Sequence, residues 1–355
     1  MSRKTETVIN VVLIGALLLV LFILEQTLPS THMIFTVLKK GAIYALVAVS
    51  MNLLNGFTGL FSLGQAGFML VGAYTYGVLT IPVADRANVY MYFNGGLIQF
   101  ALHPIIAIVL AGVMAGIFAY LIGLPVLRLK SDYLAIATLG FAEIIRAIFQ
   151  WDKLGPITNG SNLLRSYPSY KSLLFYFIAS GVCIALIVML INSSFGRAFK
   201  AIRDDEVAAE AMGINLAHHK RMSFCISSFF AGVGGALLAM YQTTIQAQAF
   251  KSNMTYEILL IVVIGGLGSV TGSVLATFLF YAASEWWLRF LDSPLTIGSF
   301  QVPLLRSGFR KVVFSVVIMA IVLFARQGIM GDHEFSIAGL MRLFRRKGKE
   351  ASANE

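Results

Sequence analysis

Long apolar stretches recur along the chain and are separated by short polar connections. A transmembrane helix needs about 20 consecutive, mostly apolar residues, and the pattern meets or approaches that length repeatedly. It predicts about ten spans, at residues 8–26, 36–54, 64–81, 104–125, 133–150, 172–192, 222–243, 256–270, 272–290 and 312–325. We therefore expect an all-α, polytopic membrane protein whose transmembrane helices include glycine-broken segments. The expected organisation is a transmembrane domain over residues 1–331, with a cytoplasmic loop of short helices at 193–221, and a basic cytoplasmic tail over residues 332–355.

The composition agrees with a membrane protein. Of the 355 residues, 58% are hydrophobic and 12% are charged, whereas an ordinary soluble domain carries about 25% charged residues. The net charge of +10 does not indicate nucleic-acid binding, because the basic residues are scattered and form no stripe with aromatic residues. Cys183 and Cys225 both lie inside apolar runs without the spacing of a metal or redox motif, so we expect small core residues and no metal site.

The distribution of basic residues predicts the orientation. Lysine and arginine are more frequent in the segments that fall inside when the spans alternate from a cytoplasmic N-terminus, as the positive-inside rule expects. The even number of spans and the basic C-terminal tail then place both termini in the cytoplasm. The first apolar run follows Arg3-Lys4 but lacks a small-x-small cleavage site before Glu25, which favours a retained first span.

A first unusual segment, residues 55–68, mixes glycine and hydroxyl residues with leucine and phenylalanine. Non-helical backbone at membrane depth is tolerated only where it is buried in protein or lines a watery cavity. The pattern therefore favours a broken helix beside a translocation path; a tight helix–helix contact made by small residues is the alternative, and both can hold together. The candidate path residues here are Thr58, Gly59, Ser62, Gly64 and Gln65.

A second segment of the same character, residues 264–273, lies in the C-terminal half of the chain. One glycine-interrupted apolar segment in each half is typical of transporters built from repeats, in which such segments mark a central site. The two segments share composition but little letter-by-letter identity. The candidate path residues here are Gly265, Gly266, Gly268 and Ser269.

The loop at 193–221 predicts two short helices on the cytoplasmic side. Phe195, Phe199 and Ile202 repeat at helical spacing and form one short apolar face. Residues 204–206 are acidic and supply a cap and first-turn negative charge for a second helix, and Gly213 is placed to end it. An amphipathic helix resting on lipid head groups is the alternative, but acidic residues are repelled by an anionic leaflet. The pattern favours a docking surface for a cytoplasmic protein.

Glu143 and Arg146 lie three residues apart within the predicted span at 133–150, so they share one helix face and can pair. Charges inside a span are costly, which suggests a function by default. Two interpretations stay open: a role in translocation or gating, or a structural ion pair whose arginine reaches the outer interface.

Four motifs carry a resemblance to a known family. One of them lies in the predicted span at 133–150 and reads Tyr133-x-Ala135-Ile136-x-Thr138-Leu139-x-Phe141-Ala142-Glu143-Ile144. The other three lie in the two glycine segments and the cytoplasmic loop. The first reads Gly56-x-x-Gly59-x-x-Ser62-Leu63-Gly64-Gln65-Ala66, followed by Gly72-Ala73-Tyr74-Thr75. The second, in the cytoplasmic loop, reads Gly196-Arg197-Ala198-x-x-Ala201-Ile202-Arg203-Asp204-x-Glu206-x-Ala208-Ala209-x-Ala211-x-Gly213-Ile214, and the third is Gly265-Gly266-x-Gly268-Ser269. Together they resemble the branched-chain amino acid ABC importer permeases, in particular the M-type subunit of the high-affinity importer.

The resemblance implies a permease subunit that is not itself an enzyme and that lies in the bacterial inner membrane. Its loop at 193–221 would be the coupling loop that docks on the ATPase, with the residues Gly196, Arg197, Ala201, Arg203, Asp204, Glu206, Ala208, Ala209 and Gly213. It further implies a second, H-type permease, two ATPase subunits and an external solute-binding protein, besides membrane lipid. The chain has no G-x-x-x-x-G-K-[ST] phosphate loop, so ATP and magnesium would be bound by the ATPase subunits and no cofactor by this chain.

Two departures from the family pattern leave the solute open. Gln65 stands where the family usually has histidine, and residues 158–163 replace a more glycine-rich external motif. Branched-chain amino acids are the family's usual solutes, while urea, short amides and other amino acids are carried by related permeases. An ion-coupled carrier or a channel is the alternative function, although a proton relay would need more ionisable residues within the spans than Glu143 alone.

Overall fold

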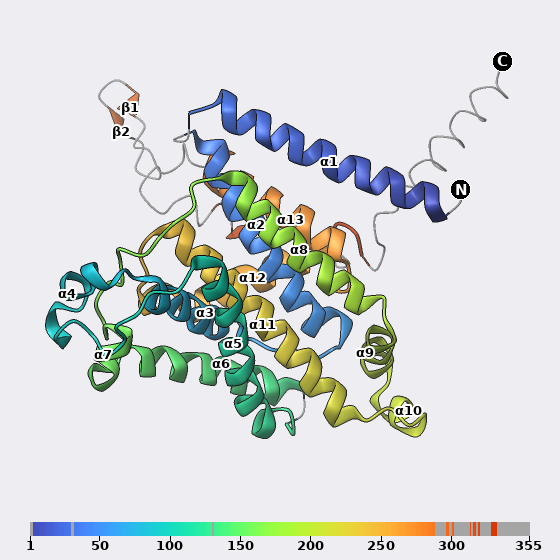
Figure 1. Ribbon diagram of the computed structural model, residues 1–355. Helices are drawn as coiled ribbons and strands as arrows, with labels where there is room; N and C mark the ends of the chain where they lie inside the picture. Colours follow the sequence, from blue (N-terminus) through green and yellow to red (C-terminus); the bar gives the residue numbers. More distant parts are fainter. Residues whose placement is uncertain are drawn as a thin grey trace, which may run out of the picture.

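The computed structural model describes residues 3–29, 32–129, 131–287, 296–297, 300–301, 313, 315–316, 319 and 328–331. The longer helices make up its body (Figure 1). They are α1 (Arg3–Thr27), α2 (Met33–Asn52), α3 (Gln65–Thr80), α5 (Pro104–Val126), α6 (Ser131–Phe149), α8 (Leu173–Ile191), α11 (Leu216–Gln242), α12 (Ser252–Gly265) and α13 (Val270–Ala282).

Short elements connect these helices. They are η1 (Leu53–Phe57), η2 (Val83–Asp85), α4 (Arg86–Val89), η3 (Met91–Phe93), η4 (Asp152–Leu154), α7 (Gly155–Thr158), α9 (Ser194–Asp204), α10 (Glu206–Ala211), η5 (Ala247–Ala249) and η6 (Ala283–Trp287). η1 and η6 are single π-helical turns that extend α2 and α13. Two two-residue strands, Thr296–Ile297 and Phe300–Gln301, pair antiparallel.

The core lies around α3, which is buried on almost every side and packs against α11 and α5. Its apolar residues show no preferred face, as expected of a helix that is buried all round. Small residues allow the close approach of α3 and α11. A Cβ atom on Gly72 would lie 2.0 Å from the carbonyl oxygen of Gly232, and one on Gly235 would lie 2.0 Å from that of Met69. The tight helix contact expected as the alternative for residues 55–68 is also present, because a Cβ atom on Gly67 would lie 2.8 Å from the Cα atom of Ala142 on α6.

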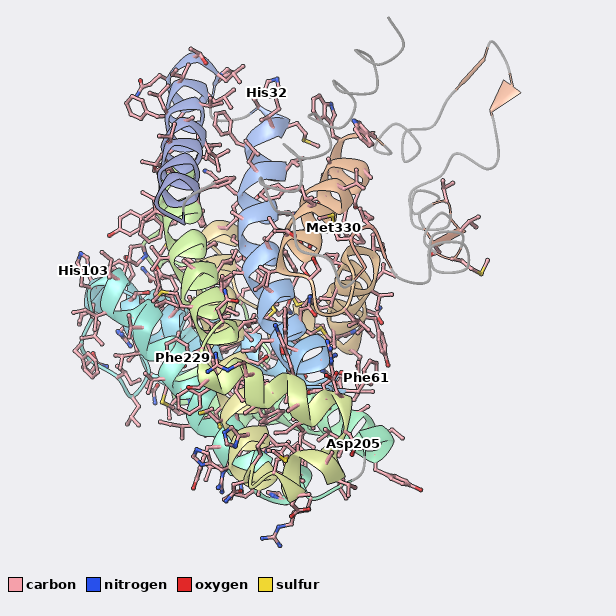
Figure 2. The ribbon with its side chains drawn as sticks, turned by 90° about the vertical axis from the view of Figure 1, so that its right-hand side faces the viewer. His32, Phe61, His103, Asp205, Phe229 and Met330 are labelled. Carbon is pink, nitrogen blue, oxygen red and sulfur yellow. The ribbon has the colours of Figure 1, made fainter. Side chains whose placement is uncertain are left out.

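The two ends of the helical body carry different elements. α9 and α10 lie on the opposite side of the molecule from α4 and α7 (Figure 1). In the orthogonal view, Phe61 and Asp205 lie near the same end of α2, and His32 lies at the other (Figure 2). The link between α2 and α3 and the α9–α10 pair therefore share one end of the molecule.

Four helices of the described residues are individually long and apolar enough to cross a membrane: Met33–Phe57, Pro104–Val126, Leu173–Ile191 and Leu216–Gln242. Counting each of two strongly bent helix pairs as one span raises the number to six. This is an all-α, polytopic membrane fold, but the expected number of about ten spans is not confirmed. α12 and α13, with 14 and 13 residues, are each shorter than the usual spanning length. The expected span at 312–325 lies mostly outside the described residues, and the tail at 332–355 lies wholly outside them.

Candidate functional site

The first glycine segment is a break in the helical structure, as the sequence predicts. α2 passes into the π turn η1, and the backbone is then irregular from Thr58 until α3 begins at Gln65. Neighbouring side chains satisfy the freed backbone groups. The Asn55 amide exchanges two hydrogen bonds with the Ser62 backbone, at 3.1 and 3.3 Å, and the Thr58 hydroxyl donates to the Leu53 carbonyl at 2.9 Å. These polar side chains are buried, so the break is held from within the protein.

The second glycine segment is a tight turn between α12 and α13. Gly266 and Gly268 have φ values of 111° and 93°, a region that residues with a Cβ atom rarely adopt. Ser269 then caps α13, because its hydroxyl accepts a hydrogen bond from the Gly272 N–H at 3.1 Å.

The two breaks touch each other, and one buried side chain joins them. A Cβ atom on Gly56 would lie 2.4 Å from the backbone nitrogen of Gly268. The amide nitrogen of Asn52 donates to three oxygens of the second segment, and its amide oxygen accepts from the Gly268 N–H at 2.9 Å. The three acceptors are the carbonyls of Gly266 (3.3 Å) and Ser269 (2.9 Å) and the hydroxyl of Ser273 (2.8 Å).

The sequence places both segments at a central site, but it does not single out Asn52. The only feature of the sequence that marks Asn52 is its position, as a polar residue one helical turn before Gly56. Gln65 is also fully packed: it is buried, and its amide donates to the Ser50 hydroxyl at 2.8 Å.

α9 rests directly on the first break. The Arg203 guanidinium donates to the Gly56 carbonyl at 3.3 Å, and a Cβ atom on Gly59 would meet Arg203 at 3.0–3.3 Å. The Lys200 ammonium lies 5.5 Å from the centre of the Phe57 ring, within the range of a cation–π interaction. The predicted apolar face of α9 is confirmed for Phe199 and Ile202, which are buried, but not for Phe195, which is 45% exposed.

α10 follows α9 as a separate short helix. The Asp205 carboxylate accepts from the N–H groups of Val207 (2.8 Å) and Ala208 (3.1 Å), so one of the expected acidic residues caps the helix. Gly213, with φ of 85°, follows its end, as predicted. Two apolar side chains that the sequence analysis did not single out project here: Val207 is 78% exposed and Met212 is 83% exposed.

The other predicted loop residues lie on the same two helices. Gly196 packs so closely on α8 that a Cβ atom would lie 2.0 Å from the Ile191 carbonyl oxygen. The Glu206 carboxylate pairs with Lys220 on α11 at 2.5 Å, which fixes α10 against α11. Of the remaining residues, Ala209 is buried, and Arg197, Ala201, Asp204 and Ala208 complete the pair of helices.

Glu143 lies at the opposite end of α12 from Gly265 of the candidate path. One of its oxygens accepts from Arg146 Nε at 2.6 Å, and the other accepts from the backbone N–H and hydroxyl of Ser252, at 3.2 and 2.6 Å. Ser252 begins α12, whereas Gly265 ends it, so the two ends are separated by about 21 Å of helix. Glu143 and Arg146 thus form the predicted ion pair and anchor α6 to the start of α12.

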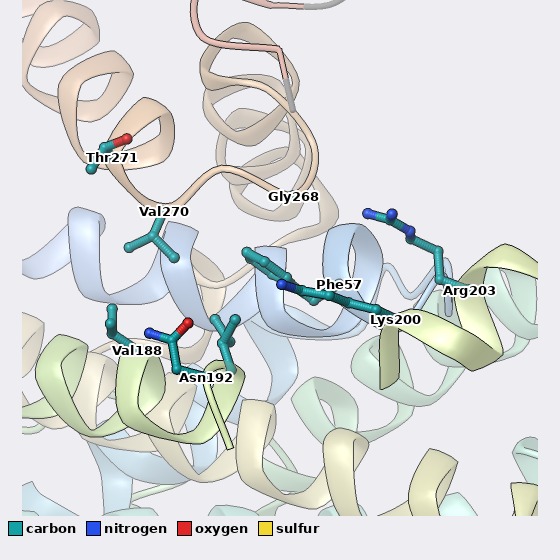
Figure 3. A pocket seen from close by; sticks show the side chains of 9 residues that line it. Phe57, Val188, Asn192, Lys200, Arg203, Gly268, Val270 and Thr271 are labelled. Atoms are coloured by element: carbon teal, nitrogen blue, oxygen red, sulfur yellow. The ribbon is translucent and has the colours of Figure 1, made fainter. Parts of the chain in front are cut away.

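A cavity of about 420 Å³ lies where α8, α9, η1 and the α12–α13 turn meet (Figure 3). Gly268 of the candidate path lines it, together with Phe57, Lys200 and Arg203. Among the described residues, no three His, Cys, Asp or Glu side chains are arranged to hold a metal ion.

Comparison with known proteins decides the family. The family model described as "Branched-chain amino acid transport system / permease component" matches residues 33–325. The chain belongs to this family of permeases. Its match covers both breaks, α9 and α10, so the elements that meet at one end of the molecule all fall inside the family's domain.

Curated permeases of the family are similar to this chain. The high-affinity branched-chain amino acid transport system permease protein LivM of Escherichia coli K12 is 31% identical over 73% of this chain and 65% of its own length. LivM of Salmonella typhimurium is 29% identical with the same coverage. The high-affinity branched-chain amino acid transport system permease protein LivH of Escherichia coli K12 is 21% identical over 87% of this chain and 98% of its own length.

The chain therefore spans about two thirds (65%) of the length of these LivM proteins. No solved structure matches the chain. As a member of this permease family, it is a multi-pass membrane protein.

Proposed function

We propose that the chain is the membrane-spanning permease subunit of an ATP-binding-cassette importer. It translocates branched-chain amino acids, or a related small polar solute, and is powered by a separate ATPase subunit. The names of the LivM and LivH relatives support the solute and the importer class. The observation that carries the proposal is the contact of α9 with the first break, in which the Arg203 guanidinium donates to the Gly56 carbonyl.

The geometry supports a path of contacts by which ATP hydrolysis in the ATPase could move the two breaks. The ATPase docks on α9 and α10, where Val207 and Met212 offer exposed apolar contacts. Movement of α9 reaches the first break through the Arg203–Gly56 hydrogen bond and then the second break through Asn52. Both breaks then shift together, and the backbone around residues 58–65 and 265–269 changes its packing beside the translocation path.

The expected partners and orientation belong to the same proposal. ATP and magnesium bind in the ATPase, and a second, H-type permease and an external solute-binding protein complete the importer in the bacterial inner membrane. With α9 and α10 in the cytoplasm, the start of α8 faces outward. Glu25 near the end of α1 accepts hydrogen bonds from Ser172 and Leu173 at that start, so the beginning of α1 points to the cytoplasm. The basic tail at 332–355 is proposed to lie there too.

The test is uptake of radiolabelled leucine by proteoliposomes that contain the chain with its ATPase, second permease and solute-binding protein. We expect uptake only with ATP inside the vesicles. Uptake that persists without ATP, or that follows an ion gradient instead, would replace the importer with an ion-coupled carrier or a channel.

The docking surface is tested by binding of the ATPase to Val207→Asp. This change adds an acid in the first turn of α10, where the helix tolerates it, but it removes an exposed apolar contact, so we expect about tenfold weaker binding. Val83→Asp, which also charges an exposed valine but lies far from α10 in the chain and fold, should bind normally. Equal affinity of both variants would contradict docking at α10.

A further inference from the structure

The cavity at the meeting point of α8, α9 and the two breaks has a positively charged lining. Among the residues that the structure describes, its lining contains two cations, two neutral polar side chains and no carboxylate. The lining residues are Phe57, Val188, Ile191, Asn192, Lys200, Arg203, Gly268, Val270 and Thr271. In Figure 3 the Lys200 and Arg203 side chains extend from α9 toward Phe57 and Gly268.

The positive charge of this lining is only partly compensated. Within the described part of the chain, Lys200 has no carboxylate within salt-bridge distance, and its ammonium meets the Phe57 ring instead. Arg203 pairs with Asp204 at 3.0 Å and donates to the Gly56 carbonyl. These interactions leave further N–H donors on the guanidinium for another acceptor.

An apolar surface leads along α8 to the cavity. Ile178, Val182, Leu186 and Met189 are exposed and follow one another at spacings of four, four and three residues, so they share one face of the helix. Asn192, three residues after Met189, is its neighbour one turn further along α8. It lines the cavity together with Val188 and Ile191, which lie on the adjoining face of the helix. A ligand with both a charged group and a hydrocarbon chain would match the cavity and this stripe together.

We propose that the cavity binds the phosphate group of an anionic phospholipid, with an acyl chain lying along the α8 stripe. Basic pockets between transmembrane helices at the membrane surface bind anionic lipid head groups in this way. Inorganic phosphate would use the two cations but not the apolar stripe, so the lipid is the better match. Because Phe57 and Gly268 both line the cavity, a bound lipid contacts both breaks. The inference does not depend on the transported solute or on ATP.

The test uses the purified full chain in a neutral detergent and native mass spectrometry to count retained phosphatidylglycerol. Lys200→Gln should retain about fivefold less lipid, the effect of one basic side chain near a lipid phosphate. Lys153→Gln is the matched control, because Lys153 also lies over an aromatic ring, that of Trp151 at 5.3 Å, but in a different part of the fold. It should retain as much lipid as the unchanged chain.

Two further experiments test whether the bound molecule is an anionic phospholipid. Val188→Trp fills the cavity and keeps both cations, so it should also lose the lipid. Thermal stabilisation should be produced by short-chain phosphatidylglycerol, but not by short-chain phosphatidylcholine or inorganic phosphate. Equal retention by the Lys200 and Lys153 variants would overturn the site, and equal stabilisation by inorganic phosphate would overturn the lipid as its occupant.

Discussion

At the scale of single residues, Asn52 is the unusual feature of α2. A polar side chain in an apolar helix is costly unless its hydrogen-bonding groups are paired. Asn52 is fully buried and has four partners, all in the second glycine segment. One amide therefore fixes the relative position of two breaks that lie more than 200 residues apart in sequence.

Replacing Asn52 with leucine should lower the stability of the protein by about 2 kcal/mol or more, because it leaves buried donors and acceptors of the second break unpaired. The measurement is the midpoint of thermal unfolding in detergent. Asn162→Leu is the control, since Asn162 is exposed and its side chain makes one local hydrogen bond, to the Asn159 carbonyl. Equal midpoints for the two variants would show that Asn52 does not hold the breaks together.

The sequence could not reveal this residue because its partners are distant in the chain. Glycine and hydroxyl patterns mark where a helix breaks, since they reflect local backbone needs, and both breaks were predicted correctly. Which side chain joins two breaks depends on their meeting in space. For the same reason, the sequence does not show that Glu143 bonds to Ser252 at the start of α12.

At the scale of helices, the core depends on the close approach of α3 and α11 at their glycine residues. α3 and α11 cross where Gly72 faces the backbone of Gly232 and Gly235 faces that of Met69. Backbone atoms cannot move aside as a flexible side chain can, so this crossing tolerates no added atom. Membrane helices associate largely through such packing.

We therefore expect Gly72→Ala to destabilise the protein by about 1–3 kcal/mol, the usual cost of overpacking. Gly181→Ala is the matched control on α8, where an added Cβ atom meets nothing within 4 Å. It should leave the unfolding midpoint unchanged or raise it slightly, because alanine favours a helix over glycine. A Gly72 variant as stable as the Gly181 variant would mean that the α3–α11 crossing is loose.

The short helix α10 depends on its cap. Asp205→Ala removes the acceptor for two backbone N–H groups and should cost about 1 kcal/mol of local stability, whereas Asp205→Asn keeps an acceptor and should cost little. Amide hydrogen exchange of Val207 and Ala208 should be about fivefold faster in the alanine variant alone. Faster exchange in both variants would assign the effect to the lost charge rather than to the cap.

At the scale of the whole molecule, the hydrophobic pattern predicts where helices lie better than how many cross the membrane. Each expected span before residue 291 overlaps a helix. The number of crossings could not be deduced, because apolar runs do not show how far a helix bends. α3 with α4 and α6 with α7 turn by 100° and 61° at short breaks, and these angles are set by packing between distant segments.

The central claim is that Arg203 couples a movement of α9, driven by ATP hydrolysis in a partner subunit, to the two breaks. It is tested most directly by the ratio of leucine taken up to ATP hydrolysed in proteoliposomes that contain the complete importer with Arg203→Gln. The change removes the charged donor to Gly56 but leaves the exposed side chains of α10 in place. We predict that hydrolysis continues while uptake falls about tenfold. An unchanged ratio of uptake to hydrolysis would contradict the account.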